Sequence, residues 1–262
     1  MFETLEIERD ARGVATLWLS RAGKHNALSA RMIAELTEAA GDLGADDSVR
    51  AVILAARGRS FCAGGDLGWM RDQLAATPGA RRAQARELAM MLQALNTLPK
   101  PLIGRVQGHA FGAGVGLVSV CDVALGAEGV EMALTETRLG LIPATICHYV
   151  AGRMGEGRAR RVFMSGRRFV ASEAVDLGLL ARVVPEPVLD RAVEEEVAPY
   201  LACAPGAVAE AKALLRRFGP VIDAEAIEAS VEALAACWEG PEAREGITAF
   251  FERRAPSWTE GG

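Results

Sequence analysis

Residues 102–125 read LIGRVQGHAFGAGVGLVSVCDVAL, and this stretch decides the fold class. It begins with an apolar run at Leu102–Val106, passes through a glycine-rich segment into a helix-like stretch at Val115–Cys121, and ends in a second apolar run at Val123–Leu125. Short strands separated by a helical crossover are typical of a mainly parallel α/β core. The stretch therefore predicts an α/β protein.

The same alternation of strands and helices extends toward the N-terminus. Thr4–Ile7 and Val14–Leu19 are β-like runs joined by the turn Asp10–Gly13, and Val52–Ala55 is typical of a buried strand. One helix follows a capping Ser29, and a second spans Arg81–Leu98 before Pro99. Their apolar stripes are Met32, Ile33, Leu36 and Leu43 in the first helix, and Leu88, Met91, Leu92, Leu95 and Leu98 in the second.

From about Gly157 onward the pattern changes to consecutive helices. The expected helices are Arg158–Met164, Ala171–Leu177, Pro187–Ala202, Pro205–Arg217, Ala224–Cys237 and Glu242–Arg254. No low-complexity linker separates them from the first half. We place the division near residue 200, with an α/β core at residues 1–200 and a helical region at residues 201–262.

Composition narrows the class of protein. The 262 residues suffice for a sizeable core, and the net charge of −5 argues against nucleic acid as the main partner. Five scattered cysteines without a CxxC pair favour a reducing compartment and indicate no zinc site. The start MFETLEIERD is unlike a secretory signal, and no apolar run of about 20 residues could span a membrane. We expect a cytoplasmic protein that binds no membrane.

Two glycine-rich segments follow strands. Phe61–Leu67 reads FCAGGDL and is compatible with close approach of its backbone to a ligand, although a Gly-Gly-Asp turn also connects many strands and helices. Gly108–Gly116 reads GHAFGAGVG and leads into a helix, whose free N–H groups suit an oxygen that gains negative charge. Its spacing is GxGxG and not GxGxxG, which argues against a dinucleotide site; tight helix packing is the other interpretation.

A third segment, Met132–Pro143, places Glu136 in a mostly apolar stretch that ends in a proline turn. A carboxyl group held against apolar surface has a raised pKa and can exchange protons near neutrality. The competing interpretation is a surface glutamate paired with Arg138.

Six segments in this order resemble the crotonase superfamily, also described as the enoyl-CoA hydratase/isomerase family, over nearly the whole chain. They are Ala22–Leu28 (AGKHNAL), Phe61–Leu67, Gly108–Gly116, Glu136–Pro143, Ala171–Val184 (ASEAVDLGLLARVV) and Glu245–Arg254 (EGITAFFERR). The resemblance implies a spiral of ββα units with a C-terminal helical trimerisation region. It also implies homotrimers or hexamers and an acyl-CoA thioester substrate. Nothing in the sequence implies a metal or a redox cofactor.

The resemblance also assigns site residues by position. The backbone N–H groups of Ala63 and Ala113 would form an oxyanion hole for the thioester oxygen, and Glu136 would be the acid–base group. Around coenzyme A it places Lys24, Ala27, Ala63, Gly65, Asp66 and Leu67, together with Phe250 and Arg253 reaching a neighbouring subunit's coenzyme A. Two N–H donors aimed at an enolate oxygen contribute about 3–4 kcal/mol each.

The chain departs from the common hydratase pattern at Gly116, where that pattern has a first catalytic glutamate. One carboxylate suits an isomerase that moves a proton between C2 and C4. The amino-acid sequence around the sites nevertheless resembles that of methylglutaconyl-CoA-type hydratases, in which glycine is common at this position. We therefore place an enoyl-CoA hydratase ahead of a Δ3-Δ2-enoyl-CoA isomerase, and both ahead of a thioester hydrolase or a non-catalytic or RNA-binding scaffold.

Three further side chains lie near these segments in the sequence. His109 adjoins the second glycine-rich segment, and His148 and Tyr149 follow the Glu136 segment toward a possible acyl pocket. We expect all of them to have packing roles. Cys62 has no partnered base in view and is expected to be a small buried filler.

Overall fold

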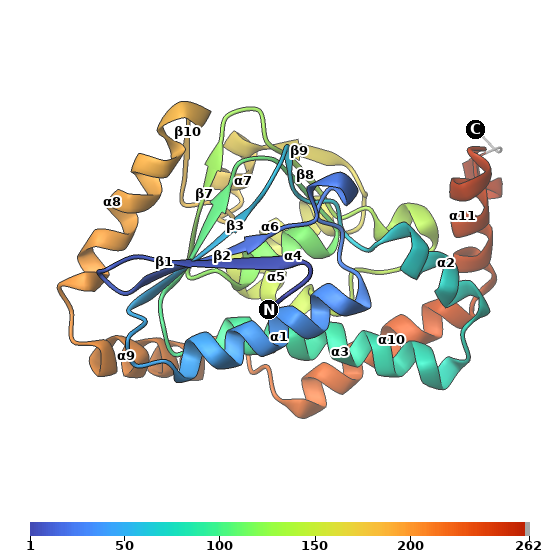
Figure 1. Ribbon diagram of the computed structural model, residues 1–262. Coiled ribbons are helices and arrows are strands. Elements are labelled where there is room, and N and C mark those ends of the chain that lie inside the picture. The colour runs from blue at the N-terminus through green and yellow to red at the C-terminus, as the bar shows by residue number, and fades with distance from the viewer. Residues whose placement is uncertain (260–262) are drawn as a thin grey trace.

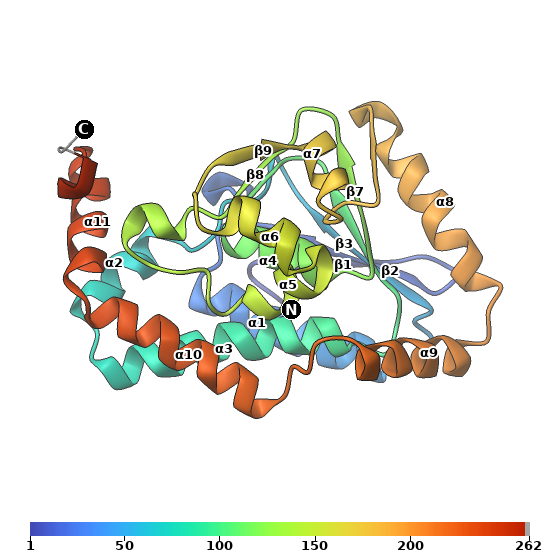
Figure 2. The same ribbon diagram turned by 180° about the vertical axis from the view of Figure 1, so that it is seen from behind.

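The computed structural model describes residues 1–259, and two β-sheets form its framework (Figures 1 and 2). The larger sheet has the order β1-β2-β3-β5-β7-β10, and the smaller has the order β4-β6-β8-β9. The strands of the larger sheet are β1 Leu5–Arg9, β2 Val14–Leu19, β3 Ala51–Ala56, β5 Leu102–Val106, β7 Val123–Ala127 and β10 Arg182–Val184. Those of the smaller sheet are β4 Ser60–Cys62, β6 His109–Phe111, β8 Glu131–Ala133 and β9 Arg168–Val170.

The larger sheet confirms the predicted mainly parallel α/β class. Only β1 and β2 run antiparallel, and β2-β3, β3-β5, β5-β7 and β7-β10 all pair in parallel. Parallel neighbours need a long crossover, and the helices between the strands supply it. The strands β3 and β5 consist almost entirely of buried residues, which explains why they read as continuous apolar runs without alternation.

Eleven α-helices surround the sheets in the described part of the chain. They are α1 Ala30–Ala45, α2 Leu67–Ala75, α3 Pro78–Thr97, α4 Ala113–Val120, α5 Cys147–Met154, α6 Glu156–Phe163, α7 Ala171–Asp176, α8 Leu189–Leu201, α9 Pro205–Phe218, α10 Ala224–Glu239 and α11 Pro241–Glu252. Short 3₁₀ turns span Ala22–Lys24, Glu136–Leu139, Glu186–Val188 and Ser257–Thr259. The Ser29 side chain caps α1 as predicted, accepting a hydrogen bond from the Met32 N–H at 3.3 Å.

The sequence patterns missed the smaller sheet, helix α5 and strand β10, and β9 and β10 interrupt the run of helices expected after Gly157. Each strand of the smaller sheet has three residues, which is too short for a periodic pattern to appear. Two predicted helix starts were also late. Helix α3 begins at Pro78 because Thr77 caps it and proline suits a first helical position, and α4 begins at Ala113 and not at Val115.

Helices α1, α3, α9 and α10 run below the strands in the view of Figure 1. Helices α1 and α3 pack on each other, and α10 lies along α3 (Figures 1 and 2). The six helices predicted after Gly157 are all present, with bounds within a few residues of those expected. The division near residue 200 stays a prediction, and residues 260–262 of its helical region lie outside the described residues. No helix within residues 1–259 is long and apolar enough to cross a membrane.

Candidate active site

The two glycine-rich segments lie against each other because their strands pair. Strands β4 and β6 run parallel, with Ser60 opposite His109 and Cys62 opposite Ala110. A methyl group at Gly64 would lie 3.0 Å from the Phe111 carbonyl oxygen, and one at Gly114 would lie 3.0 Å from the Cys62 Cβ. The backbones therefore approach more closely than residues with side chains would allow. Two segments far apart in the sequence thus form one surface.

This surface carries backbone N–H groups without acceptors among the described residues, including those of Gly65 and Ala113. Ala113 is the first residue of α4, so its N–H has no intrahelical partner. Within residues 1–259 neither the Ala113 N–H nor the Gly65 N–H donates to a protein acceptor. Both donors are available to an oxygen that gains negative charge, and the Ala113 donor adds the favourable end of the α4 dipole.

The structure corrects the assignment of Ala63 as an oxyanion donor. The Ala63 N–H donates to the His25 carbonyl oxygen at 3.0 Å, so it is already satisfied. The chain turns at Gly64, which has φ +93°, and the Gly65 N–H that follows donates to no protein acceptor among the described residues. Gly65 and Ala113 are therefore the candidate pair of oxyanion donors. Ala63 itself stays exposed at the rim of the surface.

Glu136 begins the 3₁₀ turn Glu136–Leu139, and its carboxylate lies against Gly112, immediately before α4. Gly112 has φ +50°, and a methyl group there would lie 2.8 Å from Glu136 Oε1. Although Glu136 as a residue is partly exposed, its Oε2 atom is buried without a hydrogen-bond partner among the described residues. Removal from water raises the pKa of the Glu136 carboxyl to about 7, and the hydrogen bond from its own N–H opposes this only in part.

The alternative interpretation of Glu136, a surface glutamate paired with Arg138, is wrong. The Glu136 Oε2 atom has no hydrogen-bond partner among the described residues, and the exposed Arg138 packs along Gly166 instead. The carboxyl group is therefore suited to accepting and returning a proton near neutral pH.

Gly116 occupies the second turn of α4, and Ile146 fills the space beside it. A methyl group at Gly116 would lie 2.5 Å from Ile146 Cγ2 and 3.1 Å from Ile146 Cβ, and Ile146 is only 1% exposed. A larger side chain at position 116 would therefore require Ile146 to move. The sequence signalled the glycine, but nothing in it identified Ile146 as its neighbour.

The segment His25–Leu28 lies beside Gly64–Asp66 and fixes its course. The Leu28 N–H donates to Gly64 O at 2.8 Å, and the Asp66 N–H donates to Leu28 O at 2.9 Å. Ala27 is buried, whereas Lys24 and Leu67 are exposed along this edge. The structure thus brings together the predicted residues Lys24, Ala27, Ala63, Gly65, Asp66 and Leu67.

Asp66 has a structural partner and a capping role. Its carboxylate accepts from the Gly68 and Trp69 N–H groups at the start of α2 and pairs with Arg21 at 3.0 Å. These hydrogen bonds hold the pKa of Asp66 below its usual range against the opposing effect of burial. Phe250 and Arg253 are both exposed, Phe250 on α11 and Arg253 at its C-terminal cap, and their predicted contact with a neighbouring subunit's coenzyme A stays a prediction.

His109, His148, Tyr149 and Cys62 all have contacts within the fold, and their packing roles stay a prediction. His109 stacks on Phe111, and its Nδ1 accepts from the Glu131 N–H at 3.0 Å. His148 Nε2 lies 2.9 Å from the Ala226 carbonyl oxygen, and the Tyr149 hydroxyl donates to Gln93 Oε1. Both line a cavity of about 900 Å³ beneath α9. Burial raises the pKa of the Cys62 thiol to about 12.

Comparisons with known proteins show the family and agree with the fold. Residues 9–261 match the family model described as enoyl-CoA hydratase/isomerase. A solved enoyl-CoA hydratase from Mycobacterium smegmatis is 38% identical with a TM-score of 0.79, and covers 98% of this chain and 99% of its own. One from Shewanella pealeana is 35% identical with a TM-score of 0.81, covering 98% and 97%. One from Mycobacterium avium is 32% identical with a TM-score of 0.85, covering 98% and 100%.

Proposed function

The chain belongs to the enoyl-CoA hydratase/isomerase family, and we propose that it is an enoyl-CoA hydratase in which Glu136 is the single acid–base group. The observation that carries the proposal is the buried Glu136 carboxyl group against Gly112, whose Oε2 atom has no hydrogen-bond partner among the described residues, together with the free N–H groups of Gly65 and Ala113. A proton acceptor and an oxyanion hole are what addition of water to a conjugated thioester requires.

The reaction balances with these groups alone. The Glu136 carboxylate takes a proton from water as the water oxygen bonds to C3, and the electron pair of the C2–C3 double bond moves onto the thioester oxygen. That enolate oxygen accepts hydrogen bonds from Gly65 and Ala113. The Glu136 carboxylic acid then protonates C2, which regenerates the carboxylate and leaves a 3-hydroxyacyl thioester.

Coenzyme A would lie along the edge formed by Lys24, Ala27, Ala63, Gly65, Asp66 and Leu67, with Phe250 and Arg253 contributed by a neighbouring subunit. Lys24, Ala63 and Leu67 are exposed along that edge and Ala27 is buried beside them, which supports the proposal. A homotrimer or hexamer, a cytoplasmic location and the absence of a cofactor are further predictions from the sequence. For the acyl group we propose a branched, methylglutaconyl-CoA-type chain. The basis is the resemblance of two stretches, FGAGVGLVSVCDVAL and LTETRLGLIPATICHYV, to hydratases of that type.

A Δ3-Δ2-enoyl-CoA isomerase is the second candidate, favoured by the contact between Gly116 and Ile146. That contact leaves no room for a second carboxylate at position 116. One carboxylate is sufficient to take a proton from C2 of a 3-enoyl thioester and return it at C4, with the dienolate held by the same two N–H groups.

The deciding experiment follows the ultraviolet absorbance of the conjugated enoyl thioester with matched 2-enoyl-CoA and 3-enoyl-CoA substrates, straight and branched. Loss of absorbance from a 2-enoyl substrate supports the hydratase, provided that no thiol is released, because free thiol would reveal a thioester hydrolase. A gain from a 3-enoyl substrate without any loss from a 2-enoyl one supports the isomerase.

Two variants complete that assay. Glu136→Gln should lower turnover by about 10²–10⁴-fold while ligand binding persists. The matched control is Glu128→Gln, which makes the same chemical change on an exposed turn between β7 and β8 and should keep full activity. Equal activity of both variants, or binding without any turnover in the unaltered protein, would overturn the assignment of Glu136.

A further inference from the structure

The turn that carries Glu136 has little to hold it in place by itself. The turn Glu136–Leu139 is a 3₁₀ turn of four residues, and none of them is fully buried. Its backbone is fastened by local bonds, Arg138 N–H to Thr135 O at 3.1 Å and Leu141 N–H to Glu136 O at 3.0 Å. Short 3₁₀ turns have poor hydrogen-bond geometry, so a fixed carboxylate position requires support from outside the turn.

Helix α11 provides a contact of backbone on backbone. A methyl group at Gly246 would lie 2.5 Å from the Leu139 carbonyl carbon and 2.8 Å from the Leu139 Cα. On the other side, a methyl group at Gly140 would lie 2.7 Å from the Ala243 nitrogen. Gly140 has φ +69°, so its conformation also favours glycine. Two glycines, 106 positions apart, thus let helix and turn touch without intervening side chains.

An apolar cluster separate from the main core stabilises the contact between α11 and the Glu136–Leu139 turn. Its buried members are Leu141, Ala243 and Ile247, and it includes the partly buried Leu74, Leu139, Leu234, Cys237, Trp238 and Phe251. We refer to these nine residues as the C-terminal cluster. The cluster joins the Glu136 turn and Leu141 to α10, α11 and α2, which are distant in the sequence.

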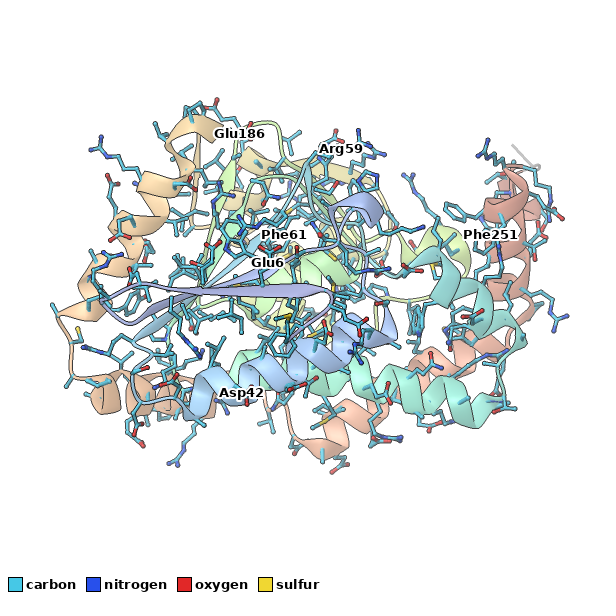
Figure 3. The ribbon with its side chains drawn as sticks, viewed as in Figure 1. Glu6, Asp42, Arg59, Phe61, Glu186 and Phe251 are labelled. Carbon is cyan, nitrogen blue, oxygen red and sulfur yellow. The ribbon has the colours of Figure 1, made fainter. Side chains whose placement is uncertain are left out.

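The same cluster reaches the other half of the site through α2. The Arg71 guanidinium lies 4.6 Å from the ring centre of Phe251, and Leu74 packs into the cluster. At the other end of α2, Trp69 lies over Gly65, where a methyl group would be 3.5 Å from the indole ring. Figures 1 and 2 both place α11 beside α2, and Figure 3 shows Phe251 on the side of α11 that faces it.

We propose that α11 is a positioning element of the active site, and that Gly246 is the positioning residue that sets the distance of Glu136 from the oxyanion donors. This inference rests on the proposed function of Glu136 as the acid–base group. Displacing a reacting group by about 1 Å lowers the rate about 100-fold. A side chain at position 246 would push on the Leu139 backbone, three residues from Glu136.

The test compares Gly246→Ala with Gly41→Ala, a helical glycine of α1 with no neighbouring atom in the way. Gly246→Ala should lower kcat about 10–100-fold while KM for the acyl-CoA changes by less than about twofold, and Gly41→Ala should keep both values. Folding of each variant is checked by circular dichroism and thermal melting. Wild-type kcat in a folded Gly246→Ala protein would overturn the inference.

A second readout needs no turnover. The carbonyl stretch of protonated Glu136, isolated as the infrared difference between wild type and Glu136→Gln, should titrate with a midpoint of about 7. Gly246→Ala should lower that midpoint by about one unit or more, because a displaced turn admits water to the carboxyl. No charged group of α4 faces Glu136, and the charged residues in this part of α11, Glu242, Arg244 and Glu245, are exposed or partly exposed. A midpoint unchanged in a folded Gly246→Ala protein contradicts the inference.

The two readouts separate this inference from the proposed function. If wild type turns over no enoyl-CoA, the proposed function fails, and the infrared midpoint still tests whether α11 positions Glu136. If Gly246→Ala does not fold, Ile247→Ala loosens the C-terminal cluster without a clash. That variant should lower the midpoint in the same direction, and a folded Ile247→Ala protein with wild-type midpoint and kcat would overturn the inference.

Discussion

Glu136 concentrates the chemistry of this chain in one side chain, because its Oε2 atom is cut off from water and from every hydrogen-bond donor among residues 1–259. A negative charge on a carboxyl group removed from water destabilises the folded state, so the Glu136 carboxyl keeps its proton to higher pH. The same burial therefore has two measurable consequences, one in catalysis and one in folding.

The catalytic consequence is a pH dependence. Only the carboxylate form accepts a proton from water, and burial raises the pKa of Glu136 to about 7. We expect kcat/KM to rise with pH between about 5.5 and about 8 and then level off. Initial rates across this range, with enzyme stability checked at each pH, measure it. A profile already level at about pH 5.5 would mean that the free enzyme hydrates this carboxyl.

The consequence for folding is that the free energy of unfolding falls with rising pH, whereas kcat/KM rises. The folded-state pKa of about 7 exceeds the ordinary value of 4.5, so the folded state holds more protons between these values. The contribution of Glu136 to the free energy of unfolding is therefore fully present below pH 4.5 and is lost as pH rises through about 7. Relative to Glu136→Gln, wild type should lose up to about 3 kcal/mol between acidic and weakly alkaline pH. Urea denaturation of both proteins measures this, and parallel pH dependences would contradict it.

The roles of single residues were predictable where the residue type and its immediate neighbours in the sequence indicated them. A carboxylate in an apolar stretch pointed to Glu136, and a glycine before a helix pointed to the free N–H of Ala113. The choice between Ala63 and Gly65 was not predictable, because the turn at Gly64 sets the direction of each N–H group. Which one is free depends on pairing with His25 and Leu28, a contact between distant segments.

At the scale of elements, α4 and α5 meet through Gly116 and Ile146, and this contact should show energetic coupling. Gly116→Ala adds a methyl group 2.5 Å from Ile146 Cγ2 and should cost about 1–3 kcal/mol of the free energy of unfolding. In an Ile146→Ala background the obstacle is gone, and the same change should become neutral or stabilising, because alanine favours helices by about 1 kcal/mol.

Urea denaturation of wild type, both single variants and the double variant measures the coupling. We expect an interaction free energy of about 1 kcal/mol or more between positions 116 and 146. The control is Gly41→Ala in α1, where no atom obstructs the methyl group and stabilisation is expected. Additive free energies would show that Ile146 moves aside at no cost.

Elements were predictable in proportion to their length. The helices α1 and α3 carry several turns of an apolar stripe, and both were expected from the sequence. The strands β4, β6, β8 and β9 have three residues each and carry no such signal, although they bring the two glycine-rich segments together. The site therefore depends on the elements that the sequence pattern shows least.

At the scale of the whole molecule, α9 stands out, because none of its side chains is buried within residues 1–259. Leu215, Phe218 and the following Val221 are 74%, 83% and 72% exposed. A helix of 14 residues is marginal in water unless an apolar face packs against something. Exposed apolar patches of this kind mark interaction sites. From these exposed side chains, and from the trimer or hexamer predicted from the sequence, we predict that a second copy of the chain covers α9.

Sedimentation velocity at micromolar concentration tests this assembly. Wild type should sediment as a trimer or hexamer, and Phe218→Glu, alone or with Leu215→Glu, should shift the population toward monomer because a carboxylate would be buried without a partner. Met164→Glu makes a similar change at a residue that is 65% exposed, on the segment after α6, and should leave the assembly intact. A monomeric wild type would contradict the predicted assembly. An assembly that tolerates both α9 substitutions would place its interface elsewhere, and the exposed face of α9 would then need another explanation.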